Sequence, residues 1–449
     1  MRTVLWVLTL ILIVVMPTQS GFYVGGTKKM VVREVQVAGA DGSVRAVTRT
    51  AEKREGGVHV SYGDAWLALV FLIWAGYVLV TVRVFEVRLP AFAVFLLLAV
   101  VLASAVHARS WGSGLREAAQ LGAYFVGGWL IFANCINTRV RLRAAAGLFT
   151  LVVAGIVVIA LVQYHAAVEG SAFLVRGTFG NRNVLGSFLA ISLPFVFAIG
   201  LYEKKVWQQF ALMLTVAFGA AVTLSGGALI ALAAALLFVA ALKSGKALVA
   251  VLVAILLAMT LLPGMMPMAR HSDVVVSSVA PYLGDSFLSA KKQGGEPEVA
   301  ARYKGWYAAT QAVRRDLHWP FLGAGPGRFN ERIETEYGFV PKPSGDTDSV
   351  ADFNISAPEP DSFSTYFVAA VEYGPLGLLA VVWIGMLFLG RNLRRRFRES
   401  DEFGKALALG AAGAVVGAAL AAVFSDVLVR GVALPFIFVA LSGILWPKE

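Results

Sequence analysis

Long apolar runs, separated by short polar segments, dominate this chain. They are continuous and do not alternate with polar residues. In lipid each backbone N–H and C=O must be satisfied within its own segment, so we expect helices and not a transmembrane β-barrel, whose strands alternate over about ten residues. Twelve runs can be distinguished, at residues 4–16, 65–82, 89–106, 118–136, 144–164, 184–201, 207–224, 228–242, 247–262, 363–389, 406–424 and 427–446.

This pattern predicts an all-α polytopic membrane protein with about 12 transmembrane helices. Residues 1–20 form the first transmembrane helix or a signal-like segment, because the first run is short and follows Arg2. Residues 21–63 contain two β-prone stretches around a Gly-rich turn, which predicts a small N-terminal β-hairpin. Residues 64–262 hold helices 2–9 and residues 362–449 hold helices 10–12. Between them, residues 263–361 form a large loop.

Charge fixes the expected orientation. The net charge of +11 could indicate nucleic acid, but a membrane protein acquires positive charge from its cytoplasmic loops. With the N-terminus inside, seventeen Lys and Arg residues fall in cytoplasmic segments and five in the short outer loops. We therefore predict cytoplasmic termini, two outer soluble segments and no nucleic-acid partner.

Metal and disulfide chemistry find little support in the sequence. The single cysteine, Cys135, lies in an apolar run, which excludes disulfides and cysteine metal sites. The five histidines show no ligand spacing. We predict no metal and no cofactor.

The first candidate motif lies at residues 176–183, which read Arg-Gly-Thr-Phe-Gly-Asn-Arg-Asn directly before an apolar run. Glycines let the backbone approach a ligand closely, and arginine and asparagine donors at a helix N-terminus suit an anion. The alternative is an ordinary capped helix with arginines at the membrane interface. Arginines on the outer side run against the topology bias, which favours the functional interpretation.

Three further motifs follow on the outer side. Residues 223–228 form a tight turn between two helices, which on its own is a plain helical hairpin. Residues 302–329 combine a basic helix with a Pro/Gly turn that has no Lys-Ser/Thr after it, so no nucleotide loop is expected. Glu372 lies about three turns beyond Asp361. An ionisable residue at that depth is either functional or a hydrogen-bonded packing residue.

In this order the motifs resemble the bacterial O-antigen ligase and O-antigen polymerase family over roughly residues 140–390. These membrane glycosyltransferases take a glycan from an undecaprenyl-diphosphate carrier. The family has an arginine, Gly-(Thr/Ser) and Asn-x-Asn before a helix, a Ser-Arg-Gly-Ala turn, a periplasmic Pro-x-x-Gly-x-Gly stretch, and a His-Asn start to a helix carrying Glu-x-Gly-x-x-Gly. The matching residues are Arg176, Gly177, Thr178, Asn181, Asn183, Pro320, Gly323, Gly325, Phe329, Glu372, Gly374 and Gly377.

Two departures change what the resemblance implies. Gly226 stands where the family turn has arginine, and Phe363 and Ser364 occupy the His-Asn positions. The histidine is the proposed base of the ligase branch, so polymerisation or transfer to another acceptor is favoured over lipopolysaccharide ligation. Asp361, two residues away, is the candidate substitute base.

The resemblance implies an enzyme of the bacterial inner membrane whose active face is periplasmic. Its partners would be the undecaprenyl-diphosphate-linked glycan, a glycan or lipid acceptor, the lipid bilayer and other polysaccharide-assembly proteins. Arginine pairs bidentately with phosphate, which suits a departing diphosphate. We expect Arg176 and Arg302 on the diphosphate with Asp361 as base. The expected substrate-binding residues are Asn181, Arg182, Asn183, Arg328 and Glu372.

Two other functions remain open. A transporter of a lipid-linked or polar solute would place charged sites near the midplane on broken helices, whereas most of the polar candidates here lie in outer loops. A family member that has lost catalysis and serves in surface-polysaccharide assembly is the other alternative.

Overall fold

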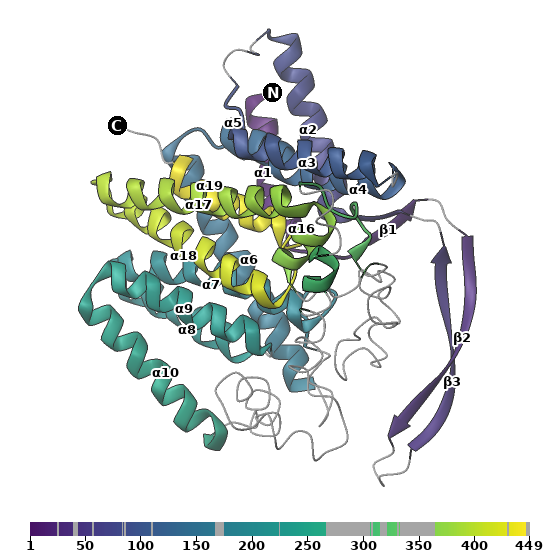
Figure 1. Ribbon diagram of the computed structural model, residues 1–449. Helices are drawn as coiled ribbons and strands as arrows, with labels where there is room; N and C mark the ends of the chain where they lie inside the picture. The colour runs from purple at the N-terminus through teal and green to yellow at the C-terminus, as the bar shows by residue number, and fades with distance from the viewer. Residues whose placement is uncertain are drawn as a thin grey trace.

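Among the residues that the structure describes, six helices are long and apolar enough to cross a membrane, so the chain is a multi-pass membrane protein (Figure 1). The computed structural model describes residues 1–24, 27–38, 44–55, 58–82, 84, 87–108, 111–166, 175–223, 225–265, 306, 309–314, 321–329, 332, 364–428 and 431–445. The six helices are α2 (Tyr62–Val80), α6 (Arg139–Ala166), α7 (Arg182–Tyr202), α9 (Gly226–Lys243), α17 (Gly374–Arg398) and α18 (Glu402–Phe424).

The other predicted runs form further apolar helices or groups of helices. α1 (Arg2–Val15), α3 (Phe92–His107), α8 (Val206–Ala221) and α19 (Ala433–Leu445) have 13 to 16 residues, and α10 (Gly245–Met265) has 21. The run predicted at 118–136 falls within α4 (Trp111–Gly122), the π-helix η2 (Ala123–Gly128) and α5 (Trp129–Cys135). The number of long spans is thus smaller than the number of apolar runs.

One predicted span is broken in two. The run at 363–389 was expected to be a single helix, but α16 (Thr365–Glu372) ends before α17 begins. Gly374 has a φ of 74°, a left-handed conformation that ends a helix, and Pro375 follows at the start of α17. The last run also starts later than expected, because α19 begins at Ala433 and not at Val427.

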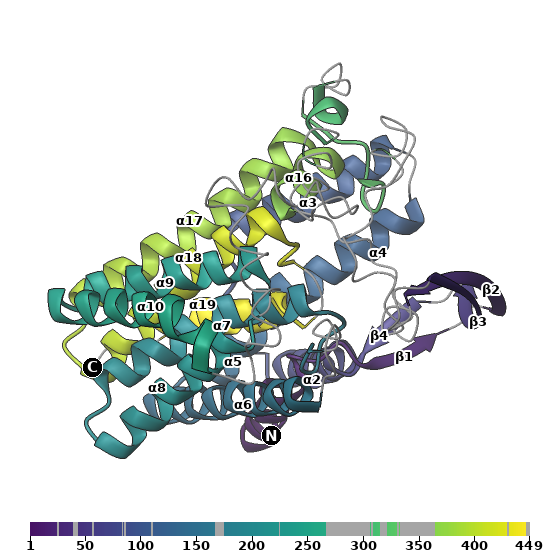
Figure 2. The same ribbon diagram turned by 90° about the horizontal axis from the view of Figure 1, so that it is seen from below.

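Exposure separates the lipid-facing helices from the centre of the molecule. Large apolar side chains are exposed on α2, α6 and α10, including Leu72 at 68%, Leu151 at 69% and Leu256 at 63%. In contrast, α7 is almost wholly buried, and Figure 2 shows it among the other helices. Exposed apolar surface on the outer helices is what a lipid environment requires.

The helices alternate in direction, so their basic termini meet at one end of the molecule. There, Arg2 donates to the Tyr77 hydroxyl (3.2 Å), and Arg143 pairs with Asp401 (3.4 Å). The Lys243 ammonium lies 3.1 Å from the ring centroid of Tyr202. We call this end, defined by these residues, the basic end. The residues predicted to lie inside the cell therefore contact one another here.

A two-stranded ribbon projects beyond the opposite end, on the side of α16 (Figure 1). Its strands β2 (Thr27–Ala38) and β3 (Val44–Glu55) pair antiparallel, from Thr27 opposite Glu55 to Ala38 opposite Val44. The shorter pair β1 (Gly21–Val24) and β4 (Val58–Ser61) joins the ribbon to the helices. The hairpin expected in residues 21–63 is present, with twelve residues in each of its two long strands.

Small residues let α18 lie close against α7 and α9. A Cβ at Gly417 would overlap the carbonyl oxygen of Ala190 in α7, and a Cβ at Gly413 would overlap Val239 in α9. Close backbone approach at small residues is a common way to pack helices in lipid, where the hydrophobic effect gives no drive for helices to associate.

We predict that Gly417→Leu destabilises the protein by at least about 1–3 kcal/mol, because the new side chain forces α18 away from α7. The measurement is thermal unfolding of the purified protein in detergent. Gly385→Leu is the matched control, since a Cβ at Gly385 in α17 meets no atom within 4 Å. Equal melting temperatures for the two variants would contradict the packing described here.

Candidate functional site

The loop before α7, which carries the first motif, is fixed by two glutamines from other segments. Gln163, near the end of α6, accepts hydrogen bonds from the backbone amides of Arg176 (2.9 Å) and Gly177 (2.7 Å). Its amide group also donates to the Gly177 carbonyl (2.9 Å). Gln19, between α1 and β1, accepts from the amide of Gly180. These contacts hold the backbone at Arg176 in one conformation.

The side chains of this motif fall into two groups. Asn181 accepts a hydrogen bond from the Val184 amide (2.9 Å) and so caps α7, which is a structural role. Nη1 of Arg176 and Oδ1 of Asn183 are buried, and neither has a hydrogen-bond partner within the described part of the chain. Arg182 is 8% exposed. Buried polar atoms that the protein leaves unsatisfied are positions where a polar ligand could bind.

The second motif packs against the first turns of α7. A Cβ at Gly186 would lie 2.7 Å from Cβ of Ala228 and 3.2 Å from Cβ of Ser225. Gly227 lies directly against the side chain of Phe424, at the end of α18. The turn at 223–228 therefore joins the start of α7 to the end of α18.

The third motif packs on α16 through aromatic and small residues. The ring of Trp306 lies 6.1 Å from that of Phe367 in α16 and 6.3 Å from that of Phe424. Ala309, Ala312 and Phe329 form a small buried cluster with Val371 of α16. The described part of the segment at 263–361 thus contacts the same end of α18 as the second motif.

The fourth motif contains a buried carboxylate that the third motif binds. Glu372, at the end of α16, is 5% exposed, and its Oε1 accepts a hydrogen bond from the amide of Phe329 (2.9 Å). The amide of Gly327 also donates to this carboxylate. Glu372 is therefore engaged by the protein itself here, and its predicted contact with substrate stays a prediction.

The glycine-rich loop also supplies donors to the end of α16. The amides of Ala324 and Gly325 donate to the carbonyls of Val371 (2.8 Å) and Glu372 (3.0 Å). The hydroxyl of Ser104, in α3, donates to the same Glu372 carbonyl at 2.6 Å. Carbonyls at a helix end have no partner in their own helix, so the loop and Ser104 take that place.

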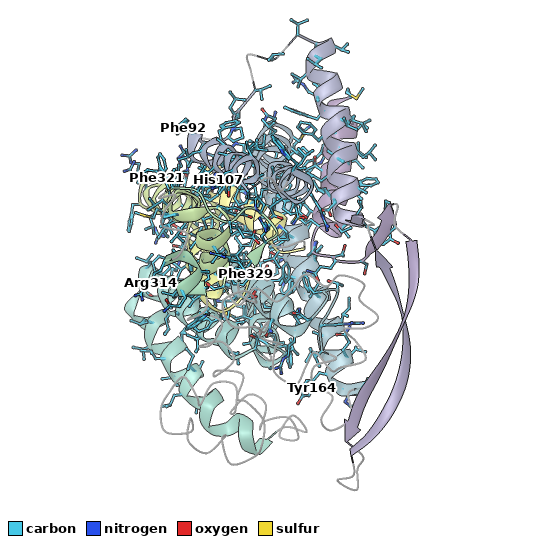
Figure 3. The ribbon with its side chains drawn as sticks, turned by 45° about the vertical axis from the view of Figure 1, so that its right-hand side comes forward. Phe92, His107, Tyr164, Arg314, Phe321 and Phe329 are labelled. Carbon is cyan, nitrogen blue, oxygen red and sulfur yellow. The ribbon has the colours of Figure 1, made fainter. Side chains whose placement is uncertain are left out.

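All four motifs therefore meet at the end of the molecule opposite the basic end. The first and second motifs are connected through Gly186, Gly227 and Phe424. The third and fourth motifs are connected through Trp306 and Glu372. Figure 3 shows Phe321 at the outer margin of the helices and Phe329 nearer their interior, at the two ends of the glycine-rich segment. Arg328 lies between the two residues whose amides bind Glu372. Two predicted catalytic residues, Arg302 and Asp361, lie outside the described residues.

Asp426, which the sequence analysis did not single out, lies at this end as well. Its Oδ1 accepts from the Thr365 hydroxyl and from the Leu428 amide, both at 3.0 Å. The Thr365 hydroxyl in turn accepts from the amide of Val427 (2.9 Å). A charged residue in the short connection between two apolar runs was the signal that could have drawn attention to it.

A search of known protein families finds none that matches this chain, and a search of curated proteins finds no match either. Within the described ranges, no three His, Cys, Asp or Glu side chains gather as a metal site. The arguments for function therefore come from the residues and their arrangement.

We predict that Gln163→Ala exposes the amides of Arg176 and Gly177 to exchange, because both lose their acceptor. A buried donor left unsatisfied costs about 1–3 kcal/mol, so exchange of the two amides should accelerate by roughly tenfold or more. Gln163→Glu keeps the acceptor oxygen and should retain protection. Hydrogen exchange followed by mass spectrometry measures both. If Gln163→Ala exchanges as slowly as the parent, the loop is held by other contacts.

Proposed function

We propose that the chain is a membrane glycosyltransferase of the O-antigen ligase and polymerase type. It transfers or polymerises a glycan from an undecaprenyl-diphosphate carrier, with polymerisation favoured over lipopolysaccharide ligation. The observation that carries this proposal is that four motifs, spread over residues 176–377, meet at one end of the molecule. A shared site explains this meeting better than four separate structural roles do.

The orientation of the molecule supports a periplasmic site in the inner membrane of a bacterium. Short cytoplasmic loops are enriched in Lys and Arg, and the segments assigned to the basic end carry seventeen of these residues against five in the short outer loops. The motifs lie at the other end, so the glycan donor would be met on the outer face. Lipid-linked donors are held at such a surface by their carrier chain, which agrees with lipid-facing helices around the site.

The proposed reaction places two demands on the protein. An acceptor hydroxyl oxygen bonds to the anomeric carbon of the donor sugar, while the bond from that carbon to the diphosphate breaks. The bonding electrons leave with the diphosphate, and the hydroxyl proton passes to a base. Arg176 and Arg302 would stabilise the charge on the diphosphate, and Asp361 would accept the proton. Preorganised donors of this type contribute about 2.7–4 kcal/mol each.

The residues of this chain favour an acceptor other than the lipid A core. The position of the family histidine is Phe363, which cannot accept a proton. A carboxylate base acting on a sugar hydroxyl of the growing glycan fits the residues present. Other polysaccharide-assembly proteins are the expected partners.

We predict that Arg176→Ala and Arg302→Ala each reduce glycan transfer by about 10²–10³-fold, since each removes one donor to the diphosphate. The measurement is glycan chain length and amount in cells, with membrane levels of the protein determined in parallel. Arg314→Ala, an exposed arginine of the same outer segment, is the control and should behave as the parent. Normal-length polymer from both variants would favour a transporter or an assembly role.

We predict separately that Asp361→Asn lowers the transfer rate by about 10²–10⁴-fold, because the amide cannot take up the acceptor proton. Asp361→Glu keeps a carboxylate and should retain part of the rate. Purified protein with lipid-linked glycan provides the assay. Full activity of Asp361→Asn would remove this residue as the base and leave the arginine assignment intact.

A further inference from the structure

The glycine-rich loop at 323–329 has the shape of an anion-binding backbone concavity. Gly325 and Gly327 have φ values of 103° and 73°, left-handed conformations that other residues rarely adopt. Left-handed residues within a turn can direct nearby amides toward one point, which makes a site for an anion. In this protein the carboxyl group of Glu372 occupies that place, because the amides of Gly327 and Phe329 both bind it.

The loop also lies in backbone contact with the break between α16 and α17. A Cβ at Gly374 would lie 2.7 Å from the carbonyl oxygen of Phe321, and a Cβ at Gly323 would overlap the Val371 carbonyl oxygen. The loop therefore has little room to shift while Glu372 holds it. Its attachment combines hydrogen bonds to Glu372 and to the end of α16 with close fit.

Arg328 is the residue whose position this attachment sets. Its neighbours on both sides, Gly327 and Phe329, donate their amides to Glu372, so the backbone at Arg328 is fixed from both directions. The Arg328 carbonyl further accepts from the amide of Arg332 at 3.0 Å. Arg328 itself is only half-buried, whereas Phe329 beside it is 5% exposed and anchored in the cluster on α16.

We infer that Glu372 is a positioning residue: its carboxylate, held in the concavity of the 323–329 loop, fixes Arg328 for contact with the diphosphate-linked donor. This inference rests on the proposed function, since it assigns Arg328 to that substrate. It gives Glu372 a task in the reaction without contact with the donor. It also gives the carboxyl group buried at this helix break a defined partner, the backbone of the loop.

The holding of the loop is tested without any glycan. Arg328→Cys introduces a thiol into a chain whose single native cysteine, Cys135, is buried near the basic end. The purified protein in detergent is treated with a maleimide, and labelling of each cysteine is followed by mass spectrometry. In an Arg328→Cys background, Glu372→Ala, which removes the acceptor oxygens, should speed labelling of the introduced thiol by roughly tenfold or more, while Cys135 stays unlabelled.

The controls make each labelling outcome decisive. Glu402→Ala removes an exposed carboxylate at the basic end and should leave labelling of the introduced thiol unchanged. An unchanged rate in Glu372→Ala would overturn the inference, because the Glu372 side chain would then not hold the loop. Labelling of Cys135 together with the introduced thiol would also overturn it, since Glu372 would then support the whole fold and not this loop.

The link to Arg328 is tested by a double-mutant cycle in the transfer assay. If Glu372 acts through Arg328, Glu372→Ala raises KM for the lipid-linked donor in the parent protein and has little further effect in Arg328→Ala. Losses that multiply in the double variant would show that Glu372 acts independently. If labelling responds as expected but none of the variants alters glycan synthesis, the loop is held by Glu372 and the proposed function is wrong.

Discussion

Backbone hydrogen bonding in a medium without water is the constraint on which this structure depends. Each place where a helix ends or breaks within the molecule leaves amides or carbonyls that another segment must satisfy. At the end of α16 the amides of Ala324 and Gly325 and the hydroxyl of Ser104 meet this need. Before α7 the side chain of Gln163 does so. The irregular segments near the motifs are therefore held by hydrogen bonds from particular residues of other segments.

Close helix packing brings these segments together. Glycines of α18 allow contact with α7 and α9, and the ends of all three helices then lie beside the turn at 223–228. Phe424, at the end of α18, contacts both Gly227 and Trp306 and so connects the membrane helices to the outer segment. A substitution in the contact between α7 and α18 would consequently shift the motifs even though the substituted residue does not contact them.

The sequence predicts the regular parts of this protein well and the irregular parts poorly. Apolar runs locate the helices because lipid requires long apolar segments, and the strands of the ribbon follow from their β-prone residues. The break at Gly374 was missed, since hydrophobicity continues across it and only the backbone conformation marks it. The contact of the glycine-rich loop with Glu372 joins residues far apart in the chain, which no local pattern reports. Asn181 was expected to bind substrate, which stays a prediction, and the structure shows that its side chain caps α7, a use of asparagine that the sequence does not distinguish from binding.

The ribbon of β2 and β3 extends far beyond the helices and is bonded at its base to the loop of Arg176. Twelve residues per strand at about 3.3 Å each make it roughly 40 Å long. Its base continues through β1 to Gln19, which binds Gly180 in the loop of Arg176. The same stretch also meets this loop through Thr178, whose carbonyl accepts from the Gln19 amide and whose hydroxyl donates to the Pro17 carbonyl. A displacement at the base of the ribbon would thus reach, through several hydrogen bonds, the backbone beside a buried guanidinium.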